Sequence, residues 1–176
     1  DANLVKMPES LAAPEHEARL LPLIDVMSTG WHGLVAGRVQ AGHNVVVIGD
    51  GAVGLSAVHG AKAMGAQNII CLGHHADRLA VAEKLGATAI GTSRDIDELK
   101  ELVMANTDGQ GAHTVVDTIS GTSSMATAHA TVRAGGSISC LGMDHFMGQT
   151  PEVNWFDQFL RNITVTGGLV HGPAYL

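Results

Sequence analysis

The sequence predicts an α/β domain built on a doubly wound parallel sheet of six strands. Three features of its 176 residues indicate this fold: short apolar runs typical of buried strands, helical segments between them, and a glycine-rich turn directly after the first run. Strands that alternate with helices form parallel sheets, because each crossover helix carries the chain back to the edge where the next strand starts. Six strands fit the order 3-2-1-4-5-6, in which ligands bind at the carboxyl ends of strands one and four.

The first strand and its turn lie at residues 44–54, which read NVVVIGDGAVG. Gly49, Gly51 and Gly54 form G-x-G-x-x-G, and the composition is helical from Ala52 onward, as a Rossmann dinucleotide fingerprint requires. In that fingerprint the first glycine permits a tight turn, the second admits a pyrophosphate against the backbone, and the third packs the helix on the strand. The alternative is a glycine turn without a ligand, because the chain contains 22 glycines.

The segment before this strand is expected to be mostly helical. Residues 1–14 show no sustained periodicity and contain two prolines, so they are expected to be connecting chain. A helical segment follows from Glu15 to Gly37, with breaks expected at Pro22 and at Thr29–Gly30.

Strands and helices alternate through the rest of the chain. Further strands are expected at 68–72, 88–90, 113–118, 137–141 and 162–166. Helices are expected at 52–64, 77–85 and 123–132, and after N-terminal caps at Thr92 or Ser93 and at Asn154.

The composition argues against two classes of partner, nucleic acids and membranes. A net charge of -7 with ten Lys and Arg residues argues against a nucleic-acid partner. No apolar run reaches the roughly 20 residues that span a bilayer, so no membrane partner is expected. Cys71 and Cys140 fall near the ends of predicted strands, where free cysteines behave as small apolar residues. We therefore expect both to be reduced and the protein to be cytoplasmic.

The residues after the second strand bear on the choice of cofactor. An acidic residue is expected about 20 positions after the fingerprint, where it binds the adenosine ribose, but that position is Gly73. His74, His75 and Arg78 follow, and the first carboxylate is Asp77, at the start of a helix. Cationic side chains without a carboxylate attract a 2'-phosphate, so the sequence predicts NADP rather than NAD. In the alternative, both histidines are ordinary solvated loop residues.

Four stretches together resemble one known family. They are DVMSTGWHG at 25–33, the fingerprint GDGAVG, AEKLGA at 82–87 and RNITVTGG at 161–168. In this order, over nearly the whole chain, they resemble the zinc-dependent medium-chain alcohol dehydrogenases, and most closely the NADP-dependent secondary-alcohol branch. That branch commonly has serine and arginine where this chain has His74 and His75.

The resemblance implies that this chain is one domain of a longer enzyme. Residues 25–176 would be the dinucleotide-binding domain, and residues 1–24 a connecting segment from a barrel-like catalytic domain. The position of Asp25 implies a zinc ligand, while the catalytic residues of the family lie outside this segment. The resemblance implies that Thr29 lies beside the nicotinamide, that Ala52 and Val53 are backbone donors to the pyrophosphate, and that Arg78 reaches the adenosine ribose. It also implies that the cofactor groove is lined by Thr118, Ile119, Leu141, Gly142 and Leu169.

The implied activity is hydride transfer between an alcohol and its aldehyde or ketone, with NADP(H), or alternatively NAD(H), as cofactor. Zinc would act as a Lewis acid in the full-length enzyme, and this segment alone would be inactive. The family also implies a homodimer or homotetramer that pairs through the sixth strand. Two other interpretations stay open: the cofactor domain of a zinc-free quinone or enone reductase, and a nucleotide-sensing module without catalysis.

Overall fold

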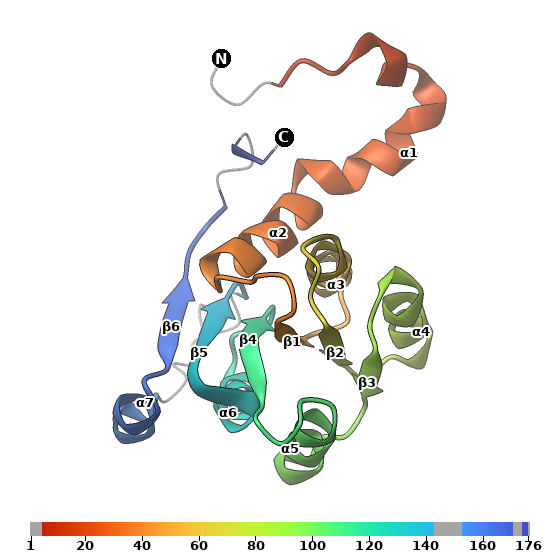
Figure 1. The fold of residues 1–176 in the computed structure, drawn as a ribbon. Helices are drawn as coiled ribbons and strands as arrows, with labels where there is room; N and C mark the ends of the chain where they lie inside the picture. Colours follow the sequence, from red (N-terminus) through yellow and green to blue (C-terminus); the bar gives the residue numbers. More distant parts are fainter. Residues whose placement is uncertain (1–4, 143–152, 171–173, 176) are drawn as a thin grey trace.

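The computed structural model describes residues 5–142, 153–170 and 174–175 of the chain. They form a six-stranded sheet in which every neighbouring pair is parallel. The strand order is β3-β2-β1-β4-β5-β6, so the predicted doubly wound fold is confirmed. Figure 1 shows the sheet with helices packed around it and the N-terminal helices extending away from it.

The element bounds follow the predicted alternation. The strands are β1 Asn44–Ile48, β2 Asn68–Leu72, β3 Ala89–Gly91, β4 Ala112–Asp117, β5 Val132–Cys140 and β6 Thr164–Gly167. The α-helices are α1 Glu17–Leu20, α2 Val26–Ala36, α3 Ala52–Ala63, α4 Ala76–Leu85, α5 Ile96–Ala105, α6 Thr122–Thr131 and α7 Trp155–Arg161. Three 3-10 helices precede α2: η1 Glu9–Leu11, η2 Pro14–His16 and η3 Leu21–Ile24. No helix among the described residues is long and apolar enough to cross a bilayer.

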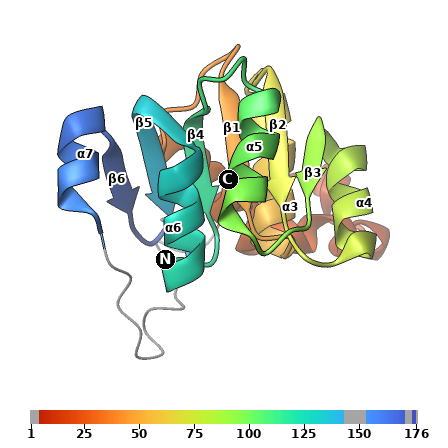
Figure 2. The same ribbon diagram turned by 90° about the horizontal axis from the view of Figure 1, so that it is seen from below.

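The core consists of two apolar layers, one on each face of the sheet. Val45 and Val47 of β1 pack with residues of α2, α3 and α4, whereas Val46 and Ile48 pack with residues of α5 and α6. All five residues of β1 are buried, as expected for a central strand that is covered on both faces. Figure 2 shows the same sheet from below, with α5 and α6 on the side facing the viewer.

The helix before the fingerprint differs from its prediction. α2 runs unbroken through Thr29 and Gly30, so the break expected there is wrong, whereas the break near Pro22 is present as η3. Gly30 lies against α3 instead: a Cβ at this residue would be 2.7 Å from the backbone nitrogen of Ala57. The described part of residues 1–24 contributes no buried residue from its helices, and residues 1–4 lie outside the described residues.

Two other local predictions need correction. The N-terminal cap of α5 is Asp95, whose side chain accepts the N–H groups of Asp97 and Glu98, and not Thr92 or Ser93. β5 starts at Val132, where a helix end was predicted, and its register against β4 shifts between Ala112 and Thr114. The predicted cap at Asn154 is confirmed, since its side chain accepts the N–H of Asp157 at 3.0 Å.

Candidate functional site

The candidate site lies at the carboxyl edge of the sheet, where β1 and β4 are neighbours. Ile48 pairs with Asp117 at the ends of these two strands. The chain leaves β1 toward α3 and β2, and leaves β4 toward α6 and β5, so the loops diverge and open a crevice between them. In open parallel sheets this reversal of strand order is where ligands bind.

The three fingerprint glycines have different surroundings. Gly49 has a φ of +109°, and a Cβ there would collide with the Thr118 side chain. A Cβ on Gly54 would collide with the carbonyl oxygen of Gly49, so the third glycine allows α3 to approach the turn closely. A Cβ on Gly51 would meet no atom within 4 Å. The open space beside the second glycine is therefore available to a ligand at the start of α3.

The N-terminus of α3 starts at Ala52 and Val53, the two predicted backbone donors. Gly51 is the N-terminal cap residue, and among the described residues no side chain caps this helix. The first N–H groups of a helix lack partners within the helix and carry its positive dipole end. This terminus can therefore bind a pyrophosphate through its backbone.

The loop after β4 forms the second wall of the crevice. The N–H and Oγ1–H of Thr118 both donate to the carbonyl oxygen of Ile48, at 3.0 and 2.8 Å. Ile119 is 40% exposed and lines the cavity. The N–H of Leu141 donates to the carbonyl oxygen of Asp117, and a Cβ on Gly142 would collide with the backbone of Ile119. The predicted residues from β4 and β5 are therefore brought together.

Asp117 holds this loop and was missed by sequence reasoning. Its buried carboxylate accepts the N–H groups of Ile119 and Ser120 at 2.9 Å and the hydroxyl of Ser124 at 2.8 Å. Burial raises its pKa, although these three hydrogen bonds act in the opposite direction. Ser120 has a φ of +57°, and its hydroxyl accepts the N–H of Gly142 at 3.1 Å. An aspartate at the end of a predicted central strand was the available signal.

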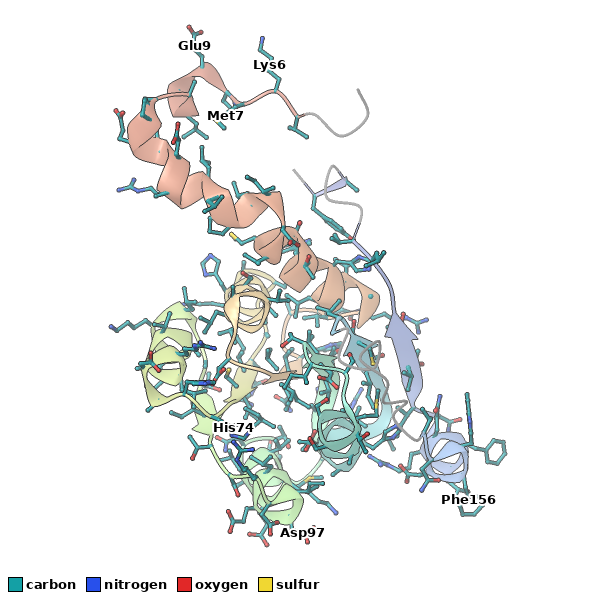
Figure 3. The ribbon with its side chains drawn as sticks, turned by 180° about the vertical axis from the view of Figure 1, so that it is seen from behind. Lys6, Met7, Glu9, His74, Asp97 and Phe156 are labelled. Atoms are coloured by element: carbon teal, nitrogen blue, oxygen red, sulfur yellow. The ribbon has the colours of Figure 1, made fainter. Side chains whose placement is uncertain are left out.

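A cavity of about 350 Å³ continues the crevice toward the ends of β2 and β3. It is lined by residues from the β1, β2, β3 and β4 loops and from α6, which include Gly49, Asp50, Gly73, His74, His75, Ser93, Arg94, Ile119 and Ser123. His74 also contacts the next loop, because its Nδ1 lies 3.4 Å from the carbonyl oxygen of Thr92. Figure 3 shows His74 in the region between α4 and α5.

The structure corrects the prediction that this end of the crevice has no carboxylate. Asp50 of the fingerprint lies there and is 6% exposed. Its Oδ2 accepts the N–H groups of His74 and His75 at 2.8 and 2.7 Å, and Nδ1 of His75 lies 3.0 Å from both of its oxygens. A guanidinium nitrogen of Arg78 lies 3.7 Å from Oδ1. A carboxylate thus lies at the end of β2, but it comes from the turn after β1.

Asp50 is held in its ionised form. Burial favours the neutral acid, but the hydrogen bonds from the backbone of His75 and His74 and from the His75 side chain outweigh it, and the pKa of Asp50 is lowered. The fingerprint predicts this acid only after β2, at the customary distance along the chain. No local spacing in the sequence indicates Asp50, because its place beside His74 depends on which loops meet.

Arg94 is a second residue that was not predicted. It is exposed, follows β3 and lines the cavity with His74. It forms no salt bridge with any described residue. Neighbouring Ser93 is engaged locally, since its hydroxyl donates to Glu98 at 2.6 Å. Arg94 therefore adds a cation to the same end of the crevice as His74 and His75.

Asp25 and Thr29 lie together at the start of α2, outside this cavity. The Thr29 hydroxyl donates to Oδ1 of Asp25 at 3.0 Å, and its N–H donates to the Asp25 carbonyl oxygen at 2.8 Å. Asp25 is exposed, and Oδ1 is its only carboxylate oxygen with a hydrogen bond among the described residues. An exposed carboxylate with a free oxygen suits a zinc ligand in its donor type. No three potential metal ligands converge within the described residues.

Leu169 is not brought to the cavity. It lies beyond β6, and 87% of it is exposed. Its predicted role beside the cofactor is therefore not visible in the arrangement of the described residues.

Comparisons with known proteins agree with this fold. The pattern of one protein family, described as zinc-binding dehydrogenase, matches residues 52–175. An NADP-dependent isopropanol dehydrogenase of Clostridium beijerinckii is 34% identical over 175 residues, which cover 98% of this chain and 48% of the relative. An alcohol dehydrogenase of Cupriavidus necator is 32% identical over 142 residues, covering 81% of this chain and 37% of the relative.

Solved structures of alcohol dehydrogenases are also similar to this chain. Alcohol dehydrogenase TADH from Thermus sp. ATN1 superposes with a TM-score of 0.87 at 29% identity, over 97% of this chain and 47% of that chain. This chain spans less than half of the length of each of these relatives. The part matched by the family pattern contains α3, the strands that follow it and the loops after β2, β3 and β4 that line the cavity. The chain therefore belongs to the zinc-binding dehydrogenases, within which it corresponds to the nucleotide-binding domain of the medium-chain alcohol dehydrogenases.

Proposed function

We propose that this chain is the cofactor-binding domain of a zinc-dependent alcohol dehydrogenase that transfers hydride between NADP(H) and an alcohol, aldehyde or ketone. The observation that carries the proposal is the geometry of the fingerprint. Gly49 and Gly54 close the turn, while the space beside Gly51 stays open at the uncapped start of α3. A pyrophosphate needs this combination of an open approach and free backbone N–H groups.

Gly51→Ala tests nucleotide binding. The backbone at Gly51 has a φ of -77°, and its added Cβ would meet no protein atom, so we expect an unchanged unfolding midpoint. The methyl group would instead occupy the approach of the pyrophosphate, and we expect the Kd for NADPH to rise at least about tenfold. Fluorescence titration of the 176-residue chain measures the Kd for each of the two cofactors, NADPH and NADH. Unchanged affinity in the folded variant would contradict binding at this turn.

The preference for NADP rests on the charges around the adenosine end of the crevice. His74, His75, Arg78 and Arg94 lie at this end, and no acidic side chain stands at residue 73. A 2'-phosphate gains charge-assisted hydrogen bonds from such groups. The similarity to relatives named as NADP-dependent isopropanol dehydrogenases supports the same choice.

Asp25 is proposed as the single zinc ligand that this chain supplies. Zinc, when bound, polarises the alcohol or carbonyl oxygen as a Lewis acid. The chain's own contribution is to hold the Asp25 carboxylate through the Thr29 hydroxyl and to bind the nucleotide in the crevice. Because the remaining ligands are assigned to a separate catalytic domain, we expect the 176-residue chain alone to bind cofactor without oxidising alcohols.

The zinc assignment is tested in a polypeptide that also carries the catalytic domain. Asp25→Ala is expected to lose stoichiometric zinc and turnover, and Asp25→Cys to recover both, because a thiolate is also a zinc ligand. Full zinc content in the alanine variant would leave Asp25 with only a structural role. Binding of NADPH serves as the control, since Asp25 lies outside the cavity and its substitution should leave the Kd unchanged.

We also propose that the protein assembles as a homodimer or homotetramer through the sixth strand. β6 is one edge of the sheet, and its outer backbone groups have no partner strand among the described residues. A bare strand edge can pair with another chain. α7 adds an apolar surface beside this edge through Trp155, Phe156, Phe159 and Leu160.

A further inference from the structure

We propose that Asp50 is the residue that sets the strength of cofactor discrimination, by acting as the counter-ion of His75 and Arg78 at the adenosine end of the crevice. The inference rests on the proposed function, because it requires that this crevice binds the nucleotide. It assigns a role to the second residue of the fingerprint, where the motif itself demands no particular side chain.

The first step is steric. A Cβ built on Gly73 would lie 2.5 Å from Oδ2 and 2.6 Å from Cβ of Asp50. The Asp50 side chain therefore fills the space that an acidic side chain at the end of β2 would need. Side chains at residues 50 and 73 would compete for the same space, so an aspartate introduced at residue 73 would have to displace the Asp50 side chain.

The second step is the saturation of the carboxylate. Oδ2 accepts two backbone N–H groups, and the Nδ1 of His75 lies within hydrogen-bond distance of both oxygens. Oδ1 also lies 3.7 Å from the Arg78 guanidinium. The Asp50 side chain is only 7% exposed. A carboxylate that is buried and engaged in this way has little capacity left to accept hydrogen bonds from ribose hydroxyls. Asp50 therefore acts on the protein's own cations and not on the sugar.

The third step follows from charge. A carboxylate 3.0 Å from the His75 ring and 3.7 Å from the Arg78 guanidinium reduces the positive potential that a 2'-phosphate would meet. Arg94 has no such partner among the described residues and lines the same cavity. Asp50 thus holds the preference for NADP below the level that the basic side chains alone would produce.

Asp50→Asn is the decisive variant. The amide oxygen can still accept the two backbone N–H groups, so the turn is retained while the charge is removed. We expect the ratio of the Kd for NADH to the Kd for NADPH to rise about tenfold, since the removed charge lies 3.7 Å from the Arg78 guanidinium and beside the His75 ring. Fluorescence titration of the 176-residue chain with both nucleotides measures this ratio. Glu83→Gln is the matched control, because it removes the same charge from an exposed position on α4.

A double-mutant cycle with Arg78→Gln separates the possible roles. If Asp50 is a counter-ion, Arg78→Gln weakens NADPH binding by less than about threefold in the original chain and by about tenfold in Asp50→Asn. If Arg78→Gln weakens NADPH binding tenfold in the original chain, the inference is overturned. This test does not depend on whether Asp50→Asn folds. A selective loss of NADH affinity in Asp50→Asn would make Asp50 a ribose acceptor and would also overturn it.

The remaining outcomes are also informative. An unchanged ratio in folded Asp50→Asn contradicts the counter-ion role and leaves the proposed function intact. If the original chain binds neither nucleotide, the proposed function fails and the inference fails with it.

Discussion

Gly51 and Gly54 are both fingerprint glycines, but the structure requires them for different reasons. The missing side chain of Gly54 allows its helix to lie against the carbonyl oxygen of Gly49. The missing side chain of Gly51 leaves an empty approach to the start of α3. Gly54 is therefore required for the packing of the fold, and Gly51 for the binding of the proposed ligand.

This difference predicts that the same substitution lowers stability at one of the two glycines and not at the other. Gly54→Ala should lower the free energy of unfolding by about 1–3 kcal/mol, because its methyl group must push the helix away from the turn. Gly51→Ala should leave that free energy unchanged within about 0.5 kcal/mol. Urea denaturation followed by circular dichroism compares the two variants directly. Equal loss in both would contradict the separate roles assigned to them.

A pair of histidines connects the first and fourth strands at the amino edge of the sheet, opposite the candidate site. His43 directly precedes β1 and His113 lies in β4, and their rings stack with centroids 4.4 Å apart. The Nδ1 of His113 accepts the N–H of Asn44 at 3.1 Å, and that of His43 accepts the N–H of Gln40 at 3.3 Å. Both hydrogen bonds require rings that are unprotonated at Nδ1.

The stacked pair predicts a loss of stability in mild acid. Burial lowers the pKa of both histidines, the charge of Arg133 lowers them further, and His43 adds to the effect on His113. A lowered folded-state pKa means that the unfolded chain binds protons first as the pH falls below about 6.5. The free energy of unfolding should therefore decrease below this pH. Urea midpoints at pH 7.5 and 5.5 should differ less in His113→Gln than in the original chain, and an equal difference would contradict this account.

At the scale of the molecule, β6 and α7 form an exposed apolar end. β6 ends the strand order, and Trp155, Phe156 and Phe159 of α7 are each more than 70% exposed. Figure 3 shows Phe156 projecting outward from α7. Exposed apolar patches of this kind commonly mark surfaces that contact another protein.

The proposed assembly predicts that a charge on α7 weakens self-association. Phe159→Glu should shift the sedimentation coefficient toward the monomer at micromolar concentration, because a carboxylate would be buried at the interface. Val81→Glu is the control, since it places the same charge on an exposed apolar position of α4, far from β6 in Figure 1. A protein that sediments as a monomer before any substitution would contradict the proposed pairing.

Most of the fold could be predicted because it depends on signals that are local in the sequence. β-branched runs indicate the central strands, and the glycines after β1 mark the turn that a dinucleotide fold needs. The bounds of β2 agree with the prediction residue for residue, and β1 adds only Asn44 to the predicted run from Val45 to Ile48. Where local signals compete, the prediction was wrong: Thr92 and Ser93 are both acceptable caps, and only the structure identifies Asp95.

The tertiary structure alone decided which loops meet at the carboxyl edge of the sheet. Asp50 and Gly73 are 23 positions apart, and they touch because β1 and β2 are neighbouring strands whose ends are in register. Likewise, Arg94 shares a cavity with His74 because the loops after β2 and β3 converge. The sequence by itself determined the alternation of strands and helices and the fingerprint, since these follow from periodicity and turn chemistry. The charge pattern around the proposed ribose site was decided only by packing, because it joins side chains that no local spacing relates.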